Sequence, residues 1–202
     1  MSTTHGLLVV ISSPSGGGKD SVINALLKQI PNSTRFVTTT SRPPRPGNKE
    51  GVDYHFVSEA DFKQKIVDGE MIESNFYAGN YYGTEKTRLE NCLKQYDLVL
   101  TQIEVNGKHS LDQAKIPHLS IFLVPESLDV LKKRIEKRGG ITPEIIAERL
   151  KIAEREIDQS NDYDYRIVNA EGKLTETIDI IAKIIHSYLS GERSLDEKRK
   201  LG

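Results

Sequence analysis

The stretch that decides the fold is Leu7-Leu-Val-Val-Ile-Ser12, followed directly by Ser13-Pro-Ser-Gly-Gly-Gly-Lys19-Asp-Ser21. Its first six residues form a short, apolar, β-branched run of the kind found in buried strands. The glycines that follow let the backbone curl until successive N–H groups point inward, and a helical pattern begins at Lys19. A helix N-terminus carries partial positive charge and, together with a lysine, suits a phosphate group. The stretch therefore predicts a strand, a phosphate-binding loop and a helix.

The loop fits the phosphate-binding pattern G-x-x-x-x-G-K-[ST] at Gly18 and Lys19 and departs from it at both ends. Ser13 stands where the first glycine is expected, and Asp20 stands where a hydroxyl would bind magnesium. A glycine-rich turn with a surface lysine is the alternative interpretation. The strand before the loop and the helix after it favour a nucleoside triphosphate site instead.

Composition excludes several classes of protein. The chain has 202 residues, with 28 Lys and Arg against 29 Asp and Glu, which gives a formal charge of −1. That balance argues against bulk binding to nucleic acid or to an anionic membrane. Cys92 is the only cysteine, so an intramolecular disulfide framework and a multi-cysteine metal site are excluded. No early apolar run is long enough to span a bilayer, and we expect a cytoplasmic protein.

Short β-branched runs alternate with longer helical patterns along the chain, which predicts an α/β fold around a parallel central sheet. We expect strands at residues 7–12, 35–38, 98–103, 119–124 and 165–168. We expect helices at residues 19–29, 59–68, 85–94, 106–114, 128–137, 143–159 and 175–189.

Two segments interrupt this alternation. Residues 39–84 are rich in proline and glycine, with short strands expected at 54–57 and 71–77, and look like an inserted lobe. Residues 134–160 are highly charged and contain Gly139-Gly140, which predicts an exposed flap whose second helix begins after Thr142 with Pro143 at its first position. The core would then comprise residues 1–38, 85–133 and 161–190, and the charged tail 191–202 is expected to be disordered.

The loop and the run Thr39-Thr-Ser-Arg-Pro-Pro-Arg-Pro-Gly47 resemble the guanylate kinase family. The resemblance continues through 51–57, 79–84, 131–139 and Val168-Asn169, and covers about residues 6–188. It implies a three-layer P-loop fold in which residues 39–84 form a GMP-binding lobe and residues 134–160 a mobile lid. It also implies ATP-dependent phosphorylation of GMP, and of dGMP, with Mg²⁺.

The same resemblance assigns site residues by position. Those implied in catalysis are Lys19, Arg134, Arg138 and Arg149. Those implied in binding ATP are Ser13, Pro14, Ser15, Gly16, Gly17, Gly18, Lys19, Asp20, Ser21 and Asn169, with Ser21 and Asp20 near the metal. Those implied in binding GMP are Thr38, Arg42, Arg45, Tyr54, Glu73, Tyr82, Thr84 and Glu104. Guanidinium forks and tyrosine hydroxyls suit the phosphate of GMP, and carboxylates suit the N–H groups of guanine.

Two departures leave alternatives open. Gln102 replaces a carboxylate that the family has near magnesium, and our hypothesis is that Asp20 compensates for it. The Gly-Lys-Asp-Ser sequence of the loop also resembles ribose 1,5-bisphosphate phosphokinase, although Arg45, Tyr54 and Glu73 favour GMP as the acceptor. Guanylate-kinase-like domains that bind phosphopeptides without catalysis are a third possibility, against which Lys19 and the lid arginines argue.

Overall fold

The computed structural model describes residues 6–77, 79–137 and 142–195. These residues form two compact units. The first unit consists of the chain up to residue 8 and of residues 32–101 and 106–117. The second unit consists of residues 9–31 and 102–105 and of the chain from residue 118. The expected α/β architecture is confirmed. A five-stranded sheet has the order β2 (Ser33–Arg35), β7 (Leu98–Thr101), β1 (Leu7–Ser12), β8 (Leu119–Pro125) and β9 (Tyr165–Asn169), and β2–β7, β1–β8 and β8–β9 pair in parallel.

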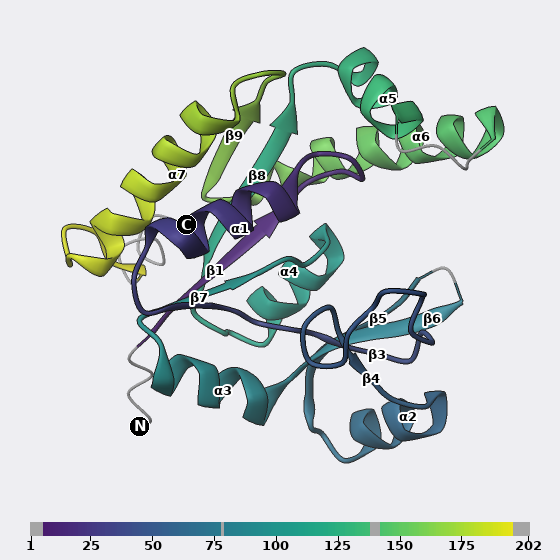
Figure 1. Ribbon diagram of the computed structural model, residues 1–202. Helices are drawn as coiled ribbons and strands as arrows, with labels where there is room; N and C mark the ends of the chain where they lie inside the picture. Colours follow the sequence, from purple (N-terminus) through teal and green to yellow (C-terminus); the bar gives the residue numbers. More distant parts are fainter. Residues whose placement is uncertain (1–5, 78, 138–141, 196–202) are drawn as a thin grey trace. The chain divides into compact units, whose positions relative to one another are not determined.

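In the second unit, strands β1, β8 and β9 lie side by side, with Ile11 opposite Ile121 and Ile121 opposite Tyr165 (Figure 1). Helices α1 (Lys19–Gln29) and α7 (Leu174–Leu189) pack against each other. Strands β1 and β8 are apolar and buried along most of their length, as is usual for parallel strands that are covered on both faces. No helix among the described residues is long and apolar enough to cross a membrane.

Helices α5 (Leu128–Lys137) and α6 (Pro143–Gln159) form a pair in the same unit (Figure 1). Leu131 and Ile135 of α5 pack on Ile146 and Ala153 of α6. The C-terminal end of α6 is fixed separately, because Ile157 packs on the cluster of Val105, Phe122 and Tyr163, just before the short helix η1 (Ser160–Asp162). Thr142 is the N-cap of α6 and Pro143 its first residue, as expected, whereas Gly139-Gly140 and Arg138 lie outside the described residues.

The first unit contains a four-stranded sheet in the order β4 (His55–Phe56), β3 (Thr39–Thr40), β6 (Asn80–Glu85) and β5 (Met71–Tyr77). Helix α2 (Glu59–Val67) packs on β5 and β6, and α3 (Lys86–Gln95) follows β6 directly. Gly83 leaves room for both neighbours: a Cβ there would lie 2.6 Å from the carbonyl oxygen of Glu73 on β5 and 3.0 Å from the ring of Phe62 on α2. The remaining helix is α4 (Val105–Gln113).

Several predicted boundaries are wrong. The strand expected at 35–38 is instead Ser33–Arg35, because the chain leaves β7 after Phe36, whose N–H donates to Leu100 O at 2.8 Å. Residues 39–40 then join the second sheet. The strand expected at 98–103 ends at Thr101, and β6 was not expected as a strand at all. The helices are confirmed to within one residue at each end, and 196–202 of the tail lie outside the described residues.

We expect Phe62→Ala to destabilise the first unit strongly. Phe62 is fully buried, and its ring stacks on Tyr81 at 5.4 Å. Removing a buried phenyl ring costs about 3–5 kcal/mol. Ile66→Ala on the same helix is the matched control, because Ile66 is 39% exposed and should lose about 1 kcal/mol or less. Urea unfolding measures both variants, and equal losses would contradict this packing.

Candidate functional site

The phosphate loop between β1 and α1 is built for glycine. Gly16 and Gly18 have φ values of 90° and 95°, in the left-handed region that other residues rarely adopt. Gly17 has no room for a side chain, since a Cβ there would lie 2.4 Å from Ser13 Oγ. Helix α1 begins directly after Gly18, whose carbonyl accepts from Val22 N–H at 3.1 Å. Because the N-cap residue is a glycine, no side chain caps the first N–H groups of the helix. The uncapped N-terminus and the curled loop together suit an anion.

Lys19 is held within this loop. Its Nζ donates to Ser13 O at 2.6 Å and to Ser13 Oγ at 3.2 Å. Ser13 is buried, and its hydroxyl donates to Pro14 O at 3.0 Å. The serine that replaces the expected first glycine thus binds the lysine through both its carbonyl and its hydroxyl oxygen. Asp20 and Ser21 are exposed in the first turn of α1.

The end of β1 is anchored by a buried chain of hydroxyl groups. Tyr163 OH donates to Ser12 Oγ at 2.8 Å, and Ser12 Oγ donates to Ile103 O at 2.5 Å. The Tyr163 ring in turn packs edge-on against Phe122, with ring centroids 5.3 Å apart. This chain fixes the residue that precedes the loop. Sequence reasoning missed Tyr163, because its partner lies 151 residues away.

Two carboxyl groups in the second unit interact electrostatically with Lys19. Burial raises the pKa of Glu156 on α6 to about 7; Lys19 opposes this shift and Glu104 adds to it. The surrounding protein also raises the pKa of Glu104, which Lys19 again opposes. A carboxyl group with a raised pKa carries less negative charge beside Lys19 near neutral pH than an ordinary glutamate would. Glu156 was not expected from the sequence, where it is one of many charged residues on an amphipathic helix.

Of the implied lid arginines, Arg134 is on α5, Arg149 is half-buried on α6, and Arg138 lies outside the described residues. Arg134 Nε donates to Glu171 Oε2 at 2.8 Å, and Arg134 Nη2 donates to Asn169 O at 3.1 Å. The guanidinium is therefore held at the end of β9. Asn169 itself is buried, and its Nδ2 donates to Gly17 O at 2.9 Å.

In the first unit, Arg42, Tyr54 and Tyr82 come together. The guanidinium carbon of Arg42 lies 5.4 Å from the centroid of the Tyr54 ring, which meets the Tyr82 ring edge-on at 5.8 Å. Asn48 Oδ1 orders the loop before them, because it accepts from Arg42 Nη2 and from the backbone N–H of Arg45, both at 3.0 Å. Arg45 has an exposed side chain. Sequence reasoning found the cation and the tyrosines but not Asn48.

Glu73 and Thr84 form a pair across β5 and β6. Glu73 is 7% exposed and Thr84 is 1% exposed. Thr84 Oγ1 donates to Glu73 Oε1 at 2.7 Å. A buried carboxylate with a fixed orientation can read N–H donors on a ligand. Thr38, also expected to contact the base, is half-buried, and its carbonyl accepts from His55 N–H at 2.9 Å. Glu104 belongs to the other unit, so its expected role at the same base stays a prediction.

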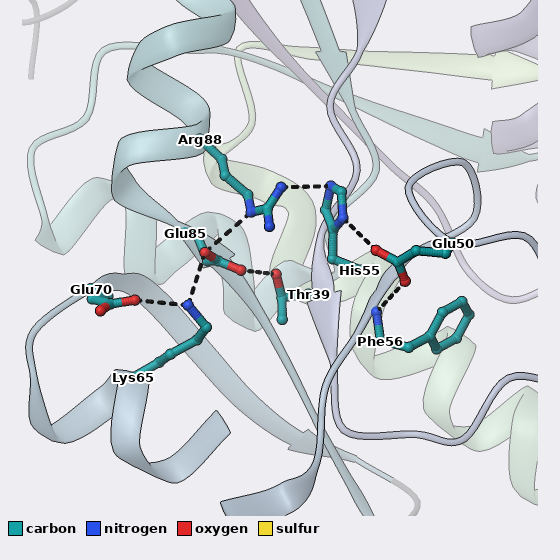
Figure 2. A network of polar contacts seen from close by, with 8 residues as sticks. All are labelled: Thr39, Glu50, His55, Phe56, Lys65, Glu70, Glu85 and Arg88. Atoms are coloured by element: carbon teal, nitrogen blue, oxygen red, sulfur yellow. Dashed lines mark hydrogen bonds and ion pairs between the residues drawn. The ribbon is translucent and has the colours of Figure 1, made fainter. Parts of the chain in front are cut away.

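A polar network centred on Glu85 holds this sheet and its helices (Figure 2). Thr39 Oγ1 donates to Glu85 Oε1 at 2.5 Å, while Lys65 Nζ and Arg88 Nε each lie 3.2 Å from Glu85 Oε2. Burial opposes ionisation of Glu85, but the hydrogen bonds and these cations outweigh it and lower its pKa. Because Glu85 directly follows Thr84, the network fixes the strand that carries Thr84.

The network continues to His55 and indicates the tautomer of its ring (Figure 2). Arg88 Nη1 lies 3.3 Å from His55 Nε2, and arginine can only donate, so Nε2 accepts. His55 Nδ1 then carries the proton and donates to Glu50 Oε1 at 2.9 Å. Glu50 Oε2 accepts from Phe56 N–H at 2.9 Å, and this hydrogen bond is the main cause of the lowered pKa of Glu50. β4 is thereby held in place beside the Arg42 cluster.

The described residues contain no group of three or more His, Cys, Asp or Glu side chains that could hold a metal ion by themselves. Magnesium in phosphoryl-transfer sites is commonly held by one or two protein oxygens and by the phosphates of the nucleotide. Gln102 Oε1 is buried with no hydrogen-bond partner in the described structure, and Asp20 and Ser21 add exposed oxygens at the start of α1. Each of these oxygens is of the type that magnesium accepts, so the residue types fit a magnesium ion that arrives with a nucleotide.

The chain is similar along most of its length to proteins of one family. A protein-family model described as "Guanylate kinase" matches residues 5–188. The chain belongs to the guanylate kinase family. It is 39% identical to the "Guanylate kinase" of Desulfitobacterium hafniense over 85% of this chain and 86% of that protein. It is 38% identical to that of Lactobacillus acidophilus over 97% and 96%.

A solved structure agrees with this membership. The crystal structure of guanylate kinase from Anaplasma phagocytophilum has a TM-score of 0.72 to this chain at 33% sequence identity. The match covers 92% of this chain and 87% of that one. The phosphate loop and the Arg42 and Glu73 clusters therefore belong to a guanylate kinase fold along nearly the whole chain.

We expect Glu156→Gln to stabilise this guanylate kinase family member more at alkaline than at acid pH. The pKa of Glu156 rises from 4.5 to about 7, so the folded state binds the proton more tightly than the unfolded chain. Stability falls as pH rises between those values, and glutamine, which cannot ionise, avoids that loss. Melting temperatures at about pH 5 and pH 8 measure the effect. Glu154→Gln, at an exposed position of α6, should show no such difference, and identical behaviour of the two variants would contradict the assignment.

Proposed function

We propose that this chain transfers the γ-phosphoryl group of ATP to GMP, and also to dGMP, forming ADP and the nucleoside diphosphate. The observation that carries the proposal is the buried Glu73–Thr84 pair on β5 and β6, because β6 also carries Tyr82 of the Arg42, Tyr54 and Tyr82 cluster. The Glu73–Thr84 pair suits the N–H donors of guanine, and the cluster around Arg42 suits a dianionic phosphate. Both lie in a family member that separately carries a triphosphate-type loop.

Different acceptor residues would bind the phosphate and the base of GMP. Arg42 and Arg45, with the hydroxyls of Tyr54 and Tyr82, would bind the phosphate of GMP, since guanidinium forks bind phosphate oxygens in pairs. Glu73 would accept hydrogen bonds from the N1–H and the exocyclic amine of guanine, with Thr38, Thr84 and Glu104 contributing further polar contacts. Adenine has no donor at N1, so a wrong base would leave the carboxylate unpaired.

The donor residues bind and neutralise the triphosphate. Residues 13–21 would surround its phosphates, and Lys19 with Arg134, Arg138 and Arg149 would offset the charge that spreads over the transferred group. The phosphate oxygen of GMP forms the new bond to the γ-phosphorus as the bond to the bridging oxygen of ADP breaks. That acceptor oxygen is already anionic, so no general base is required.

Magnesium would be held by the phosphates of ATP together with Asp20, Ser21 and the amide oxygen of Gln102. When bound, the ion supplies charge neutralisation and orientation of the phosphates. In this assignment Asp20 supplies a negative charge that Gln102 does not. A helical lid formed by residues 134–160 would exclude water during transfer, and residues 39–84 would form the acceptor lobe. Because ATP and GMP are cytoplasmic nucleotides, we propose that the enzyme acts in the cytoplasm.

The two alternatives are less favoured. A sugar-phosphate kinase has no base to recognise and no use for the buried Glu73–Thr84 pair. A phosphopeptide-binding module has no use for Lys19 held in a glycine loop. The relatives with which the chain aligns over almost its full length are named guanylate kinases.

The proposal is tested first by the choice of acceptor. A coupled assay for ADP with GMP, AMP, UMP and ribose 1,5-bisphosphate should show turnover with GMP well above that with the others. Lys19→Ala should lower kcat by about 10²–10³-fold, the scale of losing one transition-state donor. Preference for ribose 1,5-bisphosphate, or undiminished activity of the lysine variant, would refute the assignment.

Glu73→Gln should lower kcat/KM for GMP by about 100-fold, because the amide replaces one acceptor oxygen by a donor that faces donors on guanine. KM for ATP should stay unchanged. The matched control is Glu59→Gln on the exposed side of α2. A loss confined to ATP would show that the acceptor site is assigned wrongly.

A further inference from the structure

The phosphate loop is attached to the rest of the second unit by a side chain that comes from far along the chain. Asn169, the last residue of β9, is 4% exposed, and its Nδ2 donates to Gly17 O at 2.9 Å. The contact is so close that a Cβ on Gly18 would lie 2.6 Å from the same nitrogen. The amide therefore fills the space directly against the backbone of Gly17 and Gly18.

The orientation of that amide is fixed by chemistry. A backbone carbonyl can only accept, so the atom that faces Gly17 O must be the NH₂ group and not the oxygen. Asn169 Oδ1 then points the other way, where Thr177 Oγ1 lies 3.2 Å from it. Thr177 is 2% exposed on α7, and its hydroxyl is the donor that this oxygen requires. The same hydroxyl lies 3.2 Å from Lys173 O, so its single proton is shared between two acceptors.

Thr177 has no reason to be polar from packing alone. It lies on the buried stripe of α7 with Ile181 and Ile185, spaced four residues apart. A valine would have nearly the same shape and would suit that stripe. The buried hydroxyl has two acceptors, Lys173 O on its own helix and Asn169 Oδ1, and only the second links α7 to β9.

We propose that Asn169 and Thr177 are positioning residues for the phosphate loop: the Thr177 hydroxyl orients the Asn169 amide, and the amide sets the path of the backbone at Gly17. The proposal rests on the proposed function for its consequence in catalysis. The backbone carbonyl of Asn169 also accepts from Arg134 Nη2, so one residue sets both the loop and an arginine implied in binding the triphosphate. Neither side chain needs to touch the nucleotide to act in this way.

The test compares Thr177→Val, Thr177→Ser and the control Thr175→Val, which changes an exposed threonine on the same helix. Valine removes the donor, leaves Asn169 Oδ1 unpaired and frees the amide to turn away from Gly17 O. We expect about a tenfold higher Kd for Mg-ATP, the scale of one buried hydrogen bond, with KM for GMP unchanged. Serine keeps the hydroxyl and should restore the Kd of the natural protein.

Hydrogen exchange of the loop amides supplies a readout that does not depend on catalysis. In Thr177→Val the amides of residues 16–20 should exchange faster, and in Thr177→Ser and Thr175→Val they should exchange as in the natural protein. Asn169→Asp gives a second approach if the valine variant fails to fold, because a carboxylate cannot donate to Gly17 O.

Unchanged loop exchange and an unchanged Kd for Mg-ATP, with only a lower melting temperature, would overturn the proposal and leave Thr177 a structural residue. Equal effects in Thr177→Val and Thr175→Val would overturn it as well. If the natural protein proves inactive on GMP, the proposed function fails, but the exchange experiment still decides whether Thr177 and Asn169 set the loop.

Discussion

The structure of the phosphate loop depends on one steric constraint, the absence of space for side chains at Gly17 and Gly18. Ser13 closes one side and the amide of Asn169 the other, so the backbone itself is the surface of the loop. The constraint explains why the buried neighbours are polar: they must satisfy carbonyl and hydroxyl groups that a larger loop residue would have covered. Ser12 and Tyr163 hold the strand that enters the loop, and α1 begins as soon as the loop ends.

In the first unit, the buried carboxylates of Glu73 and Glu85 differ in their surroundings. Glu73 and Glu85 lie on paired strands, each is 7% exposed, and each accepts a hydrogen bond from a threonine hydroxyl. Glu85 also has two cations beside it and a lowered pKa, so its charge is used to hold strands and helices together. Glu73 is instead held by a threonine hydroxyl, and a carboxylate offers several acceptor positions, which suits recognition of N–H donors.

Sequence reasoning succeeded where the signal is local. The run Leu7–Ser12 and the helix from Lys19 follow from a β-branched segment, glycines and helical periodicity within some twenty residues, and the structure confirms both. It failed at residues 35–40, where the chain passes from one sheet to another, because only the partner strands determine that change. It also missed Thr177, although a threonine at an apolar position of the helical pattern of α7 is visible in the sequence. Glu156 and Asn48 have no such signal in the sequence, because their roles arise from contacts with distant segments or from loop geometry.

The charges around Lys19 are consistent with binding an anion near neutral pH. If Glu104 and Glu156 were both ionised, their two negative charges would exceed the single positive charge of the lysine and would repel a triphosphate. The raised pKa of both carboxyls means that a proton is retained on the pair over part of the neutral range, which reduces that repulsion. The raised pKa also shows that ionisation of Glu156 is unfavourable in this position. The neighbouring Ile157 keeps this part of α6 in place. By packing on Val105 and Phe122 it fixes the end of α6 whether or not the neighbouring carboxyl is ionised.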